Sequence, residues 1–261
     1  MISVIRTGID ASLKQLDVLS HNIANAKTTG FKTSRSSFED VYARKITLGA
    51  PSKIGHGSRS SDIRSTQTQG ALKETGQVLD LAIEGQGMFV VGNAGDDLVE
   101  RAQFTRDGSF KLDKDGFITN SQGLRLKSIL MQDIPAPTQI EVNGRKFFVK
   151  DVAIDEAGII KLQYGNNEEL VVGQIGMAQF ADASRLQETG DNLFKATAKS
   201  GAPEIEKPFE GNNGKVVPGA LEMSNVNMTS ELSTMIQAQQ AFSGASRLLQ
   251  TEADMTRRLI G

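Results

Sequence analysis

Few side chains in this chain could carry out catalysis or hold a metal. The 261 residues include no cysteine and two histidines, His21 and His56. Without thiols there are no thiolate nucleophiles, disulfides, cysteine zinc sites or iron–sulfur clusters. His21 falls in an expected helix and His56 in a glycine-rich stretch, so neither has a second histidine nearby with which to bind a metal or relay a proton. We therefore predict no catalytic residue, no metal site and no cofactor.

Two glycine motifs resemble ligand-binding loops but are better explained as turns. The motif Gly85–Gly87 lacks the third glycine of a dinucleotide loop, and the next residues, Met88–Val91, are typical of a strand. We expect a hairpin turn there. The motif Asp113–Gly116 resembles half a calcium loop. With Gly116 at position 6, however, positions 1 and 12 are Lys111 and Gln122, which are not carboxylates.

Charge and hydropathy exclude further classes of protein. The chain has 29 basic and 31 acidic residues, so no net positive field favours nucleic acid. No apolar run is long enough to span a membrane. Charged residues interrupt the first 25 positions, so we expect no cleaved secretory signal. One stretch, residues 32–64, carries a net charge of about +4, which suits either a solvated linker or contact with an acidic polymer or neighbouring subunit.

The two ends of the chain have the heptad pattern of paired helices. Near the start, apolar residues recur every seven positions at Ile2, Ile9, Leu16 and Ile23, and a second track follows at Ile5, Ser12, Leu19 and Ala26. Near the end, one track consists of Met235, Phe242 and Leu249 and a second of Ala241, Leu248 and Met255. Such seams are buried against another helix, so we predict that the two terminal helices pair in a coiled-coil-like layer.

Between the ends the period changes to two, which indicates strands. Alternating or apolar runs occur at 79–83, 88–91, 109–112, 147–154, 159–164 and 170–180. Asn143–Gly144 is a hairpin signal, and a strand–Asp/Gly turn–strand pattern occurs twice, around Asp113–Gly116 and Asp155–Gly158. We therefore expect a mixed α and β fold with a central, all-β antiparallel domain.

The composition also suggests domain boundaries. Two stretches rich in glycine, proline and serine flank the β region and are typical of connectors. The expected plan is an N-terminal helix at 1–31, an extended linker at 32–75, a β domain at 76–200, a second linker at 201–222 and a C-terminal helix at 223–261.

Four blocks of residues, in order along the chain, resemble those of the bacterial flagellar rod and hook proteins. They are Leu16–Lys32, with Asn22–Asn25 and Thr29–Lys32 at its core, Leu81–Phe89, Phe104–Phe110 and Gly219–Asn227. Within the family, the length and the block at 85–89 are similar to the distal rod subunit. The stretch from Phe38 to Leu72 looks shorter than in that subunit, so the proximal rod paralogue stays open. The longer hook protein fits poorly.

The resemblance implies a mechanical function with neither catalysis nor a cofactor. Subunits of this family pair their terminal helices into an inner layer around an export channel and polymerise into a rod that transmits motor torque to the hook. The implied partners are further copies, other rod proteins, the hook protein, the surrounding L- and P-ring bushing and the flagellar type III export apparatus. The implied location is the basal body, in the rod that spans the periplasm.

The expected assembly residues are those of the seams and of the N-terminal motif. They are Ile9, Leu16, Asn22, Ile23, Asn25, Gly30, Phe31, Met235, Phe242 and Leu249. We expect Asn22, Asn25 and Gly30 to end the first helix and turn the chain, because amides can bond freed backbone groups and glycine accepts a positive φ.

One function from a different class remains as an alternative. A β domain tethered by helices could hydrolyse or bind cell-wall glycan, since paired carboxylates for glycosidase chemistry cannot be recognised from sequence. A hydrolase, however, has no use for heptad seams at both chain ends.

Overall fold

The computed structural model describes residues 2–47, 50–137, 139–142, 145–165 and 169–260. The chain divides into two compact units. Unit 1 comprises Met1–Ala26, Thr33–Thr66 and Val226–Gly261, and unit 2 comprises Lys27–Lys32 and Gln67–Asn225. Both chain ends therefore belong to unit 1.

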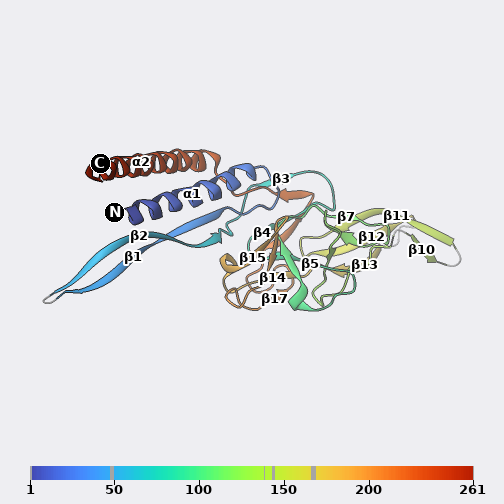
Figure 1. Ribbon diagram of the computed structural model, residues 1–261. Coiled ribbons are helices and arrows are strands. Elements are labelled where there is room, and N and C mark those ends of the chain that lie inside the picture. Colours follow the sequence, from blue (N-terminus) through green and yellow to red (C-terminus); the bar gives the residue numbers. More distant parts are fainter. Residues whose placement is uncertain (1, 48–49, 138, 143–144, 166–168, 261) are drawn as a thin grey trace. The chain divides into compact units, whose positions relative to one another are not determined.

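Unit 1 consists of two helices and a two-stranded ribbon. The helices α1 (Ile2–Ala24) and α2 (Met228–Ile260) pack against each other, as the heptad patterns predicted. The strands β1 (Ser34–Thr47) and β2 (Ala50–Ser65) pair antiparallel and also contact α1. Figure 1 shows α1 between α2 and this ribbon. The side chain of Asn227 caps α2 by accepting a hydrogen bond from the Ser230 N–H at 3.2 Å.

The ribbon lies where the sequence suggested an extended linker. Residues 34–65 lack a clear apolar alternation, and among the ribbon side chains that the structure describes Phe38 and Ile63 are exposed, at 39% and 59%. Strands also occur in the second stretch expected to be a linker. Those at Glu204–Glu206 and Lys215–Pro218 pair with strands of the β region, and the one at Ala220–Glu222 pairs with Leu72–Glu74 at the end of the first expected linker. His56 is in β2, and its side chain is outside the part that the structure describes.

Unit 2 is built from antiparallel strands, which confirms the predicted central β fold. Its elements are β3 (Leu72–Glu74), β4 (Leu81–Glu84), β5 (Met88–Gly92), η1 (Val99–Arg101), β6 (Gln103–Thr105), β7 (Lys111–Leu112), β8 (Ile118–Thr119), β9 (Arg125–Leu126), β10 (Gln139–Val142), β11 (Arg145–Ile154), β12 (Ile159–Tyr164), β13 (Glu169–Gln174), β14 (Met177–Gln179), η2 (Ala183–Arg185), β15 (Gln187–Gly190), β16 (Leu193–Lys195), β17 (Glu204–Glu206), β18 (Lys215–Pro218) and β19 (Ala220–Glu222). The main sheet has the order β15-β16-β6-β5-β9-β8-β7, with β14 paired to β5 and β17, and a second sheet has the order β10-β11-β12-β13. The pairs β18–β4 and β19–β3 complete the unit.

Two predicted turns are present and one is wrong. The Gly116 N–H donates to the Asp113 carbonyl at 3.0 Å, and the Gly158 N–H donates to the Asp155 carbonyl at 2.8 Å, so the repeated pattern forms the same turn twice. The hairpin expected at Gly85–Gly87 is absent, because β4 pairs with β18 while the next strand, β5, pairs with β6, β9 and β14. The pair Asn143–Gly144 lies outside the described residues, although β10 and β11 pair on either side of it.

The core of unit 2 contains two clusters of buried side chains. The larger one includes Leu81, Ile83, Phe89, Leu126 and Ile160, and Phe89 packs edge-on against Phe110 with ring centres 5.4 Å apart.

Neither helix among the described residues is both long and apolar enough to cross a membrane.

Candidate assembly site

The predicted seam of α2 is the partly covered side of that helix. Met235, Phe242 and Leu249 are half-buried. Ala238 and Ala245, each three residues after one of the seam residues, are also covered: Ala238 is 3% exposed and Ala245 is half-buried. Since α2 packs against α1 within unit 1, this alternating spacing of three and four residues marks the α1 contact. On α1, the predicted residues Ile9, Leu16 and Ile23 are also half-buried.

The other apolar track of α2 is exposed. Ala241 is exposed, Leu248 is 62% exposed and Met255 is 54% exposed. Leu259, four residues beyond Met255, is 86% exposed. An apolar face on a long helix is normally covered, so this track is a candidate contact surface for another molecule.

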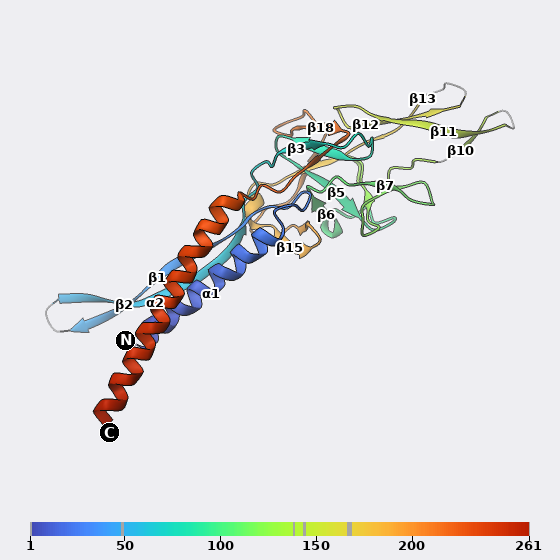
Figure 2. The same ribbon diagram turned by 90° about the horizontal axis from the view of Figure 1, so that it is seen from above.

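Asn22 joins three elements of unit 1 near the end of the first helix. It is 1% exposed. Its Nδ2 donates to the Ser34 carbonyl at 2.9 Å and to Glu231 Oε2 at 3.1 Å, and its Oδ1 accepts from the Ser34 N–H at 3.0 Å. The side chain thus ties α1 to β1 and to the start of α2. Because Asn22 is beside Glu231, the end of α1 lies beside the start of α2 and the helices run antiparallel (Figure 2).

The other motif residues lie near or just beyond the end of α1. Asn25 Nδ2 donates to the His21 carbonyl at 2.9 Å and so bonds a carbonyl of the last turn of α1. Gly30 has a φ of +67°, and a Cβ there would lie 2.5 Å from the Asp107 nitrogen, so both the conformation and the space require glycine. Phe31 belongs to unit 2 and is buried, at 6% exposed.

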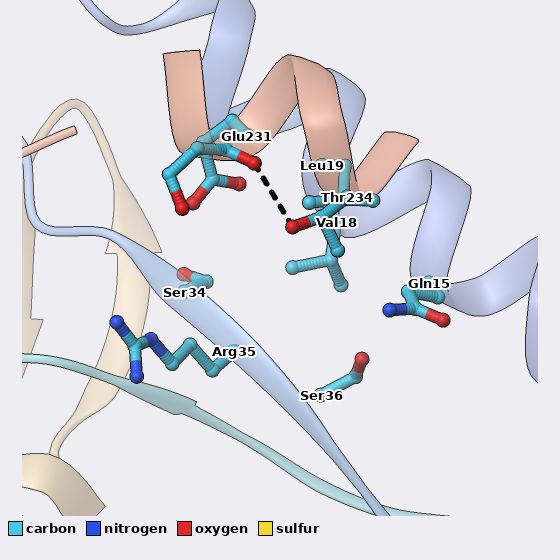
Figure 3. A pocket seen from close by; sticks show the side chains of 9 residues that line it. Gln15, Val18, Leu19, Ser34, Arg35, Ser36, Glu231 and Thr234 are labelled. Atoms are coloured by element: carbon cyan, nitrogen blue, oxygen red, sulfur yellow. Dashed lines mark hydrogen bonds between the residues drawn. The ribbon is translucent and has the colours of Figure 1, made fainter. Parts of the chain in front are cut away.

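A groove of about 320 Å³ opens between the three elements of unit 1. Val18 and Leu19 of α1, which are 8% and 6% exposed, supply its apolar part. Polar side chains surround them: Gln15, Ser34, Arg35, Ser36, Ser230, Glu231 and Thr234. Figure 3 shows the Arg35 side chain on the far side of the groove from Glu231. The Thr234 hydroxyl donates to the Ser230 carbonyl at 2.9 Å.

Unit 2 contains a buried ion cluster around Glu222. Glu222 Oε1 accepts from Lys32 Nζ at 2.6 Å and from the Gly70 N–H at 2.7 Å, and Oε2 accepts from Arg106 Nη1 at 3.0 Å. The three charged side chains are at most 5% exposed. Lys32 Nζ also donates to the Thr68 carbonyl at 2.8 Å.

This Glu222 cluster fixes the segments by which the chain leaves unit 2. Unit 2 ends at Lys32 and Asn225 and resumes at Gln67. The Gly30 N–H donates to the Glu222 carbonyl at 2.8 Å, and Asn225 Nδ2 donates to the Thr68 carbonyl at 3.0 Å. The three segments of unit 2 that lead to the helices and the ribbon are therefore held together around Glu222.

Burial is the main influence on the pKa values of the two cations in the cluster. Burial, together with the nearby Arg106 charge, lowers the pKa of Lys32 despite the opposing effect of Glu222. Burial also lowers the pKa of Arg106 from its usual value, again against the attraction of Glu222. Glu222 is thus the carboxylate that balances both cations among the described residues.

Sequence reasoning missed Arg106 and Glu222 as partners and treated Lys32 as part of a basic stretch. All three lie in the blocks that resemble the rod and hook proteins, which is the one signal that singled them out. Their pairing depends on residues more than 100 positions apart. Among the described residues no group of acidic or histidine side chains is arranged to hold a metal ion.

Three family models match this chain. A model of the flagella basal body rod protein matches residues 3–32, a model of the flagellar hook protein FlgE/F/G D1 domain matches residues 82–162, and a model of the flagellar basal body rod FlgEFG protein C-terminal region matches residues 217–261. The first and last matches cover α1 and α2, and the second covers much of unit 2.

Curated relatives match over almost the whole chain. The flagellar basal-body rod protein FlgG of Agrobacterium fabrum is 33% identical over 97% of this chain and 95% of its own length. FlgG of Bacillus subtilis is 33% identical over 94% of this chain and 92% of its own. The flagellar basal-body rod protein FlgF of Caulobacter vibrioides is 28% identical, over 95% and 91%.

Proposed function

This chain belongs to the family of flagellar basal-body rod proteins, and from that premise we propose how it works. It is a structural subunit of the rod, and its copies polymerise into a hollow shaft that transmits torque from the motor to the hook and lets exported subunits pass. The observation that carries the proposal is the match to rod proteins along nearly the full chain.

The build of unit 1 supports a role in a polymer. One heptad track of α2 is used within the chain, and a second track, with Leu248 and Met255, stays exposed. A subunit that must contact copies of itself needs such a second surface, because heterologous contacts that do not close into a ring generate helical filaments. We propose that the paired terminal helices form the inner layer around the channel.

We further propose that the subunit acts without catalysis. Torque transmission needs stiff contacts rather than a reactive cleft, and the relatives are named as rod proteins. The ion cluster around Glu222 serves stiffness, since it holds three segments of unit 2 together through side chains that solvent does not reach.

The proposed position is the distal part of the rod. The FlgG relatives from Agrobacterium fabrum and Bacillus subtilis are each 33% identical to this chain, whereas the FlgF relative is 28% identical to it. The proposed partners are further copies, other rod proteins, the hook protein, the surrounding L- and P-ring bushing and the type III export apparatus.

The proposal that the subunit acts without catalysis is tested against hydrolysis of the cell wall, the alternative that the sequence left open. Purified protein is incubated with isolated cell-wall sacculi, and soluble muropeptides are measured. Release of muropeptides would overturn the structural function.

The direct test is to delete the gene for this chain in the cells that carry it. We expect the deletion strain to lose swimming and to yield basal bodies that stop short of the hook, and we expect a plasmid copy to restore both. An antibody against the chain should label the rod of isolated hook–basal bodies. Label confined to the cell wall, or normal hooks in the deletion strain, would contradict the proposal.

A further inference from the structure

The two helices of unit 1 differ in length, and the difference leaves one end of α2 uncovered. α1 has 23 residues and α2 has 33. Because the helices run antiparallel from the contact of Asn22 with Glu231, α2 extends beyond the start of α1. Residues 253–259 are all exposed. We call this segment the α2 overhang.

The α2 overhang carries an apolar face with a cation beside it. Met255 and Leu259 are four residues apart and so lie on one side of the helix, where they are 54% and 86% exposed. Arg258 flanks this side, because it follows Met255 by three residues and directly precedes Leu259. Arg257 lies on the opposite side of the helix.

The groove at the other end of the helix pair has the complementary chemistry. Val18 and Leu19 supply an apolar part, and Glu231 and Arg35 both line its wall. Only Oε2 of Glu231 accepts a hydrogen bond among the described residues, from Asn22, and no cation there forms an ion pair with it. Figure 3 shows Glu231 and the two apolar side chains around the same space. The groove can therefore take an apolar side chain that has a cation next to it.

We propose that the α2 overhang of one copy docks in this groove of a second copy. Met255 and Leu259 then contact Val18 and Leu19 of the next copy, and Arg258 pairs with its Glu231. The overhang and the groove lie at opposite ends of one helix pair, so the contact is head-to-tail and repeats along the helix axis. This inference rests on the proposed function and specifies which surfaces the copies use.

The occupant is a second copy because the overhang cannot reach its own groove. Thr234 in the groove and Leu259 are separated by 25 helical residues, or about 38 Å at 1.5 Å per residue. The two surfaces also match in polarity, and each copy supplies both in equal number, as a polymer requires.

Disulfide trapping tests the contact, and the chain suits it because it has no cysteine of its own. We would combine Leu259→Cys with Ser36→Cys, a half-buried residue of the groove, and oxidise the concentrated, purified full-length protein. A disulfide needs Cα atoms within about 7 Å, so an intrachain bond is impossible over the helix length. We expect a ladder of dimers, trimers and longer species on non-reducing gels.

Matched variants make the result specific. Leu259→Cys with Lys14→Cys, an exposed residue of α1 outside the groove, should give no ladder. Leu259→Cys mixed with the separate Ser36→Cys protein should give dimers that contain one chain of each. Adding Arg258→Glu should lower the yield several-fold, whereas Arg257→Glu, with the same change in charge, should leave it unchanged.

Several outcomes would overturn the inference. One is the absence of a ladder, and another is an equal ladder with the Lys14 control. Dimers formed by Leu259→Cys alone would show an end-to-end contact of two overhangs instead. Swimming and rod assembly in cells that express each variant distinguish a wrong docking contact from a wrong function. If the double-cysteine variant assembles into rods and supports swimming but never cross-links, the rod function stands and the docking contact is wrong.

Discussion

At the scale of single residues, Glu222 is the side chain on which unit 2 depends most. Its carboxylate is fully buried and balances two buried cations, Lys32 and Arg106. Removing one partner of a buried ion pair leaves an uncompensated charge and typically costs about 3–5 kcal/mol. We predict that Glu222→Gln lowers the free energy of unfolding by about that amount, measured by urea denaturation.

A matched control uses an exposed ion pair of the same unit. Lys215 pairs with Glu84 at 3.2 Å, and the two side chains are 33% and 52% exposed. Lys215→Gln should leave the urea midpoint almost unchanged because solvent screens such pairs. If Glu222→Gln were as mild as this control, the cluster would not hold unit 2 together.

Gly30 is the residue whose backbone conformation matters most near the end of α1. Its φ of +67° and the 2.5 Å approach of a Cβ to the Asp107 nitrogen both oppose a side chain. We predict that Gly30→Ala destabilises unit 2 by at least about 1 kcal/mol. Gly244→Ala is the control: nothing lies within 4 Å of its Cβ position in α2, and it should add about 0.5–1 kcal/mol of helix stability. Equal effects would contradict the assignment of strain to Gly30; differential scanning calorimetry measures both.

Asp133 gives unit 2 a defined dependence on acid. Burial raises the pKa of its carboxyl, but hydrogen bonds from Lys127 and Arg125 outweigh this and hold the pKa below the usual 3.8. A lowered pKa stabilises the fold fully above pH 3.8, and the contribution is lost as the pH falls below that value. The difference in unfolding free energy between the natural chain and Asp133→Asn should therefore shrink below pH 3.8. A difference that stays constant down to pH 3 would show that the two cations do not act on Asp133.

The residue scale also shows what sequence could and could not reveal. The turn at Gly30 was predictable because a positive φ belongs to glycine locally. The cluster of Lys32, Arg106 and Glu222 was not, because nothing in the spacing of those residues says that they meet. The role of Asn22 was placed one step short, since its amide reaches Ser34 and Glu231 in other elements instead of the end of its own helix.

At the scale of elements, the two apolar tracks of α2 have separate tasks. Leu249 is half-buried in the seam with α1, and Leu248 beside it is 62% exposed. Leu249→Asp and Leu16→Asp bring a carboxylate into a helix–helix contact, where an unpaired charge costs more than one buried leucine contributes. We predict that both abolish rod assembly and weaken helix pairing in the monomer. Leu248→Asp should abolish assembly while the monomer keeps its helix content.

Circular dichroism of the purified variants and recovery of hook–basal bodies separate these cases. Lys14→Glu on the exposed side of α1 should be mild in both assays. Normal swimming with all three aspartate variants would mean that the terminal helices are not the assembly surface. Loss of the β signal would mean that they belong to the core of unit 2.

The predictability of each element follows from its pattern. The helices were predicted because a helix that buries one face carries apolar residues at seven-residue intervals along that face. The β1–β2 ribbon was not, because exposed strands such as those with Phe38 and Ile63 lack apolar alternation. The segment Gly85–Gly87 was taken for a hairpin because adjacent strands usually pair, whereas β4 and β5 lie in different sheets.

At the scale of the whole molecule, the chain order and the spatial order differ. Composition suggested five segments in sequence, but the structure interleaves two units, and strands more than 100 residues apart pair in β18–β4 and β19–β3. Such pairings depend on the folded chain and leave no local signal. The placing of both chain ends in unit 1, by contrast, was foreseen because each end carries half of one helical seam.

The central claim is that this chain builds the rod through its paired terminal helices. A cryo-electron microscopy map of hook–basal bodies isolated from its own cells tests that claim most directly. We predict that the chain fits repeating density in the rod, with α1 and α2 of every copy side by side in the layer that lines the channel. Density for the chain outside the rod, or rod subunits whose terminal helices do not pair, would contradict it.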